Sequence, residues 1–95
     1  MDQPPLFAKE LAAIYRLFGD KTRLLMAKKL SEKEWTVSEF VDLFEMSQPL
    51  VSQHLKKLKN YDLISEKRAG KKVLYRLNPE AGYYSLVLQL IAPLK

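Results

Sequence analysis

Residues 47–59 constrain the fold more than any other part of the sequence. Ser47 is a good helix N-cap, and Pro49 falls in the first turn, where a missing N–H costs nothing. Three apolar side chains follow at i, i+4 and i+7: Val51, Leu55 and Leu58. The opposite side has no acidic residue and carries Gln48, Ser52, Gln53, Lys56 and Lys59. We therefore predict a helix with one buried stripe and a polar, basic outer face.

A shorter helix is predicted directly before this one. Thr36 and Glu39 have the spacing of a capping box, and the helix ends at about Glu45. Its expected buried side is Val37, Phe40, Val41 and Phe44. Only a few residues separate the two helices, so together they form a helix-turn-helix, in which the second helix enters the major groove of DNA.

Two further helices are predicted in the first third of the chain. Apolar side chains recur with helical spacing over residues 6–18, and Gly19 interrupts the pattern. Asp20 is a suitable N-cap for a second helix, which ends near Ser31. The expected fold is mainly α, with one domain over residues 1–95.

A β-hairpin is predicted after the helix pair. Strands at 63–68 and 72–77 flank a short loop in which Gly70 allows a positive φ. Residues 53–76 carry eight basic and two acidic side chains, a net +6, whereas the rest of the chain sums to −1. A charge run is often only a solvated face, but this excess coincides with the predicted DNA-reading helix and hairpin, as a polyanion-binding surface requires.

A last helix is predicted from the Asn78 N-cap, with Pro79 at its first position, to about Ala92. The first and last helices both have wide apolar sides, which so small a domain would struggle to cover. We expect a two-fold homodimer interface there, with packing onto the same domain as the alternative. The expected interface residues are Phe7, Leu11, Ile14, Tyr83, Leu86, Val87, Leu90 and Ile91.

Composition excludes several classes of function. The chain has no cysteine, which rules out disulfides, thiolate metal sites and thiol redox switches. One histidine and no glycine-rich phosphate loop argue against an enzyme, and we expect no cofactor. No apolar run is long enough to cross a bilayer and the start does not read as a signal peptide, so we expect a cytoplasmic protein.

Two motifs resemble those of the ArsR-type bacterial regulators. Residues 47–58, followed by 63–64, are similar to the recognition-helix signature of that family. Residues 18–24 resemble its L-x-D-P-T-R-L motif, with Lys21 where proline is usual. The resemblance covers roughly residues 11–78. It implies a winged helix-turn-helix regulator that binds an inverted-repeat operator in double-stranded DNA as a homodimer and usually represses transcription.

The resemblance also implies roles for individual residues. Helix 47–59 would lie in the major groove, and the wing at 64–77 on the backbone or in a minor groove. The side chains expected nearest to base edges are Gln48, Ser52, Gln53 and His54. The other expected DNA-binding residues are Ser47, Lys56, Lys57, Lys59, Lys67, Arg68, Lys71 and Lys72. Two alternatives stay open: His54 could bond within its own domain, and the whole domain could contact a protein instead of DNA.

The sequence departs from the family at its metal sites. The family's E-L-C-V-C-E-L motif corresponds to residues 34–40, where Thr36 and Ser38 replace both cysteines. Residues 79–95 contain neither the histidine nor the aspartate that other members use to bind zinc. We hypothesise that this chain is not a metal sensor, which leaves a small molecule, a partner protein or no effector at all.

We predict that stoichiometric zinc or arsenite leaves operator affinity unchanged, because one histidine without cysteine cannot complete a site for these ions. Fluorescence anisotropy of a labelled operator, titrated with each metal, measures this directly. A fall in affinity at one metal per subunit would contradict the hypothesis.

Overall fold

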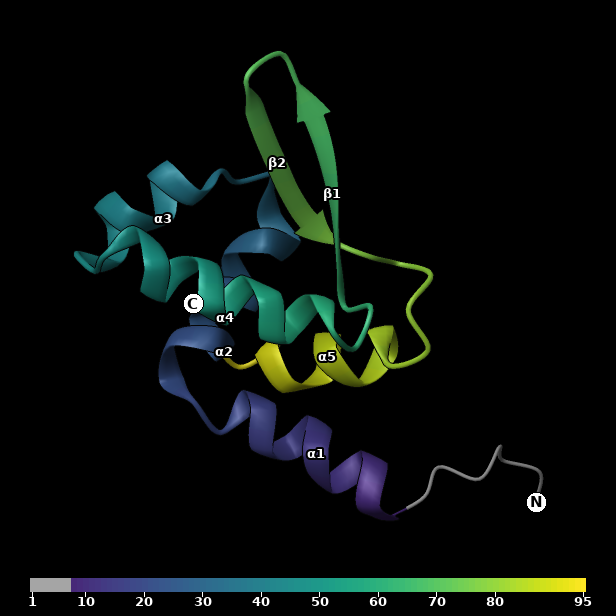
Figure 1. Cartoon of the computed structure of the whole chain (residues 1–95). Helices are drawn as coiled ribbons and strands as arrows, with labels where there is room; N and C mark the ends of the chain where they lie inside the picture. Colours follow the sequence, from purple (N-terminus) through teal and green to yellow (C-terminus); the bar gives the residue numbers. More distant parts are fainter. Residues whose placement is uncertain (1–7) are drawn as a thin grey trace.

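A computed structural model of the chain describes residues 8–95 and contains five helices and one hairpin within that range (Figure 1). The elements are α1 (Ala8–Phe18), α2 (Lys21–Glu32), α3 (Val37–Phe44), α4 (Gln48–Lys59), β1 (Ile64–Ala69), β2 (Lys72–Leu77) and α5 (Tyr84–Ile91). Their order is the predicted one. None of the described helices has the length and apolar character needed to span a membrane.

The caps of α3 and α4 form as predicted. The backbone N–H of Glu39 donates to Thr36 Oγ1 at 3.2 Å, and the N–H of Thr36 donates to Glu39 Oε1 at 2.9 Å. The Oγ of Ser47 accepts a hydrogen bond from the N–H of Leu50 at 3.4 Å. Glu45 ends α3 in the left-handed conformation with φ of 53°, which turns the chain within residues 45–47. The predicted helix-turn-helix is therefore confirmed.

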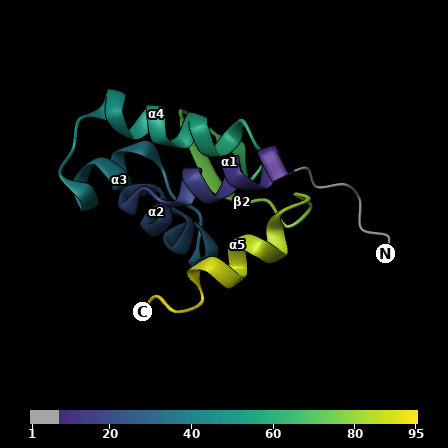
Figure 2. The same ribbon diagram turned by 90° about the horizontal axis from the view of Figure 1, so that it is seen from below.

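Helix α2 is the centre of the fold. It packs against α1, α4, α5 and β2, and Figure 2 shows it between α4 on one side and α5 on the other. The buried side chains come from every element: Ile14, Leu17, Phe18, Met26, Ala27, Leu30, Phe40, Val51, Leu55, Leu58, Leu63, Ile64, Leu77, Val87 and Ile91. Among the described residues no polar or charged side chain is buried, so this one apolar core supports both the helix pair and the hairpin.

The hairpin projects from the helices and is attached at its base (Figure 1). The strands pair antiparallel, and Gly70 in the turn has φ of +65°, as the sequence predicts. The N–H of Trp35 donates to the carbonyl of Tyr75 at 2.9 Å, and the N–H of Tyr75 donates back at 2.7 Å. These two bonds tie β2 to the segment between α2 and α3, so the wing is held in a fixed place beside the helix pair.

The predicted start of the last helix is wrong. Asn78 does not cap α5: its Oδ1 accepts from the N–H of Glu80 at 3.1 Å, and its Nδ2 donates to the carbonyl of Asp62 at 3.0 Å. The N–H of Ala81 donates to the Asn78 carbonyl at 3.1 Å, which closes a turn with Pro79 at its second position. An asparagine followed by proline suits a turn as well as a helix start, and here the turn forms. Helix α5 begins only at Tyr84, without a side-chain cap.

The predicted dimer surface needs a second correction. Ile14, Val87 and Ile91 are 0%, 1% and 3% exposed and lie in the apolar core, on helices that both pack against α2. They belong to the core of one subunit and are not available to a second. Phe7 lies outside the described residues. The half-buried members of the expected set are Leu11, Tyr83, Leu86 and Leu90.

Candidate nucleic-acid interface

The outer face of α4 is exposed and contains no acidic residue. Because the buried stripe packs inward, the polar and basic side chains point to solvent. The exposed members of the expected site are Ser47, Gln48, Ser52, Gln53, Lys56, Lys57 and Lys59. This face therefore presents two amides, hydroxyls and cations on one rigid helix.

Two ion pairs hold the wing from opposite sides. The Nζ of Lys59 on α4 donates to Oε1 of Glu66 on β1, and this pairing raises the pKa of Lys59. The Nζ of Lys67 lies 3.3 Å from Oε2 of Glu34, which precedes α3. All four side chains are at least one-third exposed, so each pair contributes little to stability. The two pairs instead help to fix the position of the wing, because they link β1 to α4 and to the segment before α3.

The cations at the wing tip are differently placed. Arg68, Lys71 and Lys72 are exposed and flank the turn at Gly70. None of the three forms an ion pair within residues 8–95. Positive charge that is not engaged inside the domain is available to a phosphate backbone. Of the wing residues expected to contact DNA, these three meet that condition, and Lys67 is already paired.

His54 does not point outward with its neighbours on α4. It is half-buried, and its Nδ1 lies 3.1 Å from Nη1 of Arg23 on α2. A guanidinium has only donors, so Nδ1 must be the acceptor and the neutral ring carries its proton on Nε2. Burial lowers the pKa of His54, and the charges of Arg23 and Lys57 lower it further against the opposing effect of Asp20. In the structure His54 therefore forms a bond within its own domain, which is the alternative that the sequence left open.

Arg23 was missed by the sequence analysis as a site residue. Its Nε donates to the carbonyl of Leu17 at 2.8 Å, and its Nη1 lies 3.7 Å from Oδ2 of Asp20. With His54 as a third partner, the side chain joins the end of α1 to the middle of α4. The sequence did contain one indication of this contact. His54 follows the buried Val51 by three residues, which places its side chain beside the buried stripe of α4.

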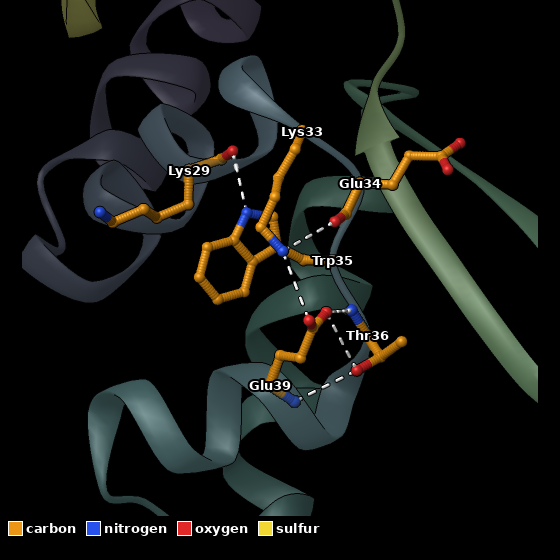
Figure 3. Close-up of polar contacts among 6 residues, drawn as sticks. All are labelled: Lys29, Lys33, Glu34, Trp35, Thr36 and Glu39. Carbon is orange, nitrogen blue, oxygen red and sulfur yellow. Dashed lines mark hydrogen bonds and ion pairs between the residues drawn. The ribbon is translucent and has the colours of Figure 1, made fainter.

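The segment aligned with the family's cysteine motif forms a polar network that holds the start of α3 (Figure 3). Lys33 lies over the ring of Trp35, 4.1 Å from its centroid, and 3.3 Å from Oε2 of Glu39. The indole Nε1 donates to the carbonyl of Lys29 at 3.1 Å. The Thr36 N–H and the Lys33 ammonium together keep the pKa of Glu39 below its usual value. Thr36 thus serves as a cap, and within residues 8–95 no three His, Cys, Asp or Glu side chains are grouped as metal ligands would be.

A helix pair with an exposed second helix, followed by a basic hairpin, defines a winged helix-turn-helix protein. Residues 20–66 match the family described as "Bacterial regulatory protein, arsR family". The chain is 35% identical over 72 residues to the arsenical resistance operon repressor of Staphylococcus xylosus, covering 76% of this chain and 69% of that protein. It therefore belongs to the ArsR family, whose members are transcription regulators and not enzymes.

Two other relatives support the same assignment. The transcriptional repressor SmtB of Mycobacterium tuberculosis is 41% identical over 64 residues, which is 67% of this chain and about half (47%) of that protein. The crystal structure of the transcriptional repressor BigR from Xylella fastidiosa superposes with a TM-score of 0.79 at 30% identity, covering 92% of this chain and 85% of that one. The predicted family and fold are confirmed.

We predict that the free energy of unfolding falls as the pH drops below about 6.5, the ordinary pKa of histidine. The folded-state pKa of His54 is lowered, so in this range the unfolded chain binds more protons than the folded one. The contribution of His54 to the free energy of unfolding is fully present above that pH. It is lost as the pH falls toward the folded-state pKa. Urea unfolding followed by circular dichroism between pH 5 and 8 measures the effect.

His54→Gln is the matched control, because glutamine retains an acceptor for Arg23 but does not titrate. Its urea midpoint should stay level between pH 5.5 and 7.5. The lowered pKa values of Asp20 and Glu39 affect stability only at more acidic pH. An equal fall in both proteins would remove His54 as the cause.

Proposed function

We propose that this protein is a homodimeric, sequence-specific repressor that binds an inverted-repeat operator with α4 in the major groove. The observation that carries the proposal is the acid-free exposed face of α4 beside the unpaired cations of the wing tip. Family membership and the repressors among its relatives support it. A domain used for protein contact would be expected to show an apolar or acidic α4 and an uncharged hairpin.

The two parts of this surface have different chemistry. On α4, the amides of Gln48 and Gln53 can bond both edge groups of an adenine, and the hydroxyl of Ser52 can donate or accept. In the wing, Arg68, Lys71 and Lys72 suit phosphates or a narrow minor groove. We assign base selection to α4 and sequence-independent attraction to the wing.

We predict that Gln53→Ala and Lys71→Ala weaken binding in different ways. Loss of the Gln53 amide should cost about 1–3 kcal/mol on the native operator and relax base preference at one position per half-site. Loss of Lys71 should weaken binding to all sequences alike and reduce the salt dependence by about one counterion per subunit. Anisotropy titrations against single-base operator variants, at several salt concentrations, separate the two effects.

The operator for these titrations comes from selecting bound fragments of the native genome. Glu80→Ala, an exposed change outside the proposed surface, controls for general effects on folding. If the wild-type protein retains no fragment at low salt, the DNA-binding proposal fails. If Gln53→Ala weakens all sequences equally, α4 does not read bases through this side chain.

We infer that α1 and α5 also form the dimer contact, through the half-buried apolar side chains on them. Leu86 and Leu90 lie four residues apart on one side of α5, next to the buried Val87 and Ile91. Tyr83 donates from its hydroxyl to Oε1 of Glu10 at 2.7 Å, which joins α5 to α1. A two-fold contact through these helices would place two α4 helices on one side of the dimer, where an inverted repeat needs them.

We predict that Leu90→Lys converts the dimer to a monomer, because it puts a charge into the proposed contact. Leu88→Lys is the matched control, since Leu88 is already 38% exposed and lies on another side of α5. Sedimentation velocity of the two variants and the wild type measures the change, and circular dichroism checks that each is folded. A wild-type protein that sediments as a monomer at tens of micromolar, or equal behaviour of both folded variants, contradicts the interface.

A further inference from the structure

A basic hollow lies between α1, α2 and α4, beside the recognition helix. Its volume is about 290 Å³, and three cations line it: Arg16 from α1, Arg23 from α2 and Lys57 from α4. Asn60 and Tyr61 complete its polar and aromatic wall, and its lining contains no acidic residue. Three like charges from three separate elements therefore converge on a hollow of small-ligand size.

Arg23 is held in place for binding before any ligand arrives. Its side chain is only 12% exposed, and the bonds to Leu17, His54 and Asp20 use Nε and Nη1. No hydrogen bond within residues 8–95 uses Nη2. Because the described residues include no buried polar side-chain atom without a partner, Nη2 reaches solvent. A guanidinium fixed in this way loses little conformational entropy when it binds a ligand.

The other two cations are exposed, and neither has a partner among the described residues. Arg16 and Lys57 form neither ion pairs nor side-chain hydrogen bonds with residues 8–95. Asp20, the acid that pairs with Nη1 of Arg23 at 3.7 Å, is not part of the lining. The lining therefore has a net positive charge, and an anion would relieve the repulsion among its members.

We propose that this hollow is a phosphate-binding site, formed by Arg16, Arg23 and Lys57. Guanidinium groups match the oxygens of a phosphate in pairs, and the lysine adds a compact charge. The hollow has room for a phosphate group, and its three cations do not suit a large apolar ligand. That phosphate can belong to the DNA backbone or to a soluble phosphate-bearing molecule. Either one would join α1 and α2 to the recognition helix, because Lys57 lies on α4 and Arg23 holds His54.

The first experiment titrates the full chain with inorganic phosphate, without DNA, and follows backbone amides by NMR at constant ionic strength. We expect saturable shifts at Arg23, Lys57 and Tyr61. Arg16→Gln should weaken the apparent affinity roughly tenfold, the loss of one charge-assisted contact. Lys95→Gln removes one positive charge outside both the hollow and the proposed DNA-binding surface, and it should leave the affinity unchanged. Neither variant alters a side chain that is bonded within the described domain.

Two results would overturn the site: shifts that fail to saturate, or an equal loss of affinity in Arg16→Gln and Lys95→Gln. Adding operator DNA to the phosphate complex then identifies the source. Displacement of the phosphate assigns the hollow to a backbone phosphate, and its retention assigns the hollow to a soluble ligand. The titration contains no DNA, so phosphate binding can succeed even if the DNA-binding proposal fails, and the reverse also holds.

Discussion

The packing of α4 on α2 is the contact on which the rest of the structure depends. Val51, Leu55 and Leu58 are almost completely buried, so α4 has one permitted rotation about its axis. That rotation alone decides that Gln53 and Lys56 face solvent and that His54 lies at the edge of the core. A shift of one residue in the apolar pattern would turn the amides inward and destroy the acid-free surface.

The position of the wing depends on this packing in turn. Ile64 and Leu77, paired at the base of the hairpin, are buried in the same core as α4. The Trp35 and Tyr75 backbone bonds fix the middle of β2 to the segment before α3. Trp35 is itself stacked on Phe40, with ring centroids 4.7 Å apart. The wing and α4 are therefore held in one rigid arrangement, although the tip of the wing lies outside the core.

Local signals in the sequence were sufficient for most of the fold. The caps at Thr36 and Ser47 and the turn at Gly70 involve neighbours within a few residues, so residue type and spacing predict them. The prediction at Asn78 was wrong because an asparagine side chain can serve either a turn or a helix start. The choice depended on the bond to Asp62, sixteen residues away. Apolar stripes on α1 and α5 predicted burial of Ile14 and Val87 correctly, but a stripe does not show what covers it.

The candidate site was less predictable, because charge in a sequence does not reveal which charges are already paired. A count of lysines gives Lys59, Lys67 and Lys71 equal weight. In the fold, however, Lys59 pairs with Glu66 and Lys67 pairs with Glu34. A paired lysine releases fewer counterions when DNA arrives, so its contribution to binding is smaller than its formal charge suggests. On the proposed DNA-binding surface, the attraction would therefore come mainly from the unpaired cations of α4 and the wing tip. In the proposed complex, two exposed ion pairs that add little to stability would thus decide which cations meet the phosphates.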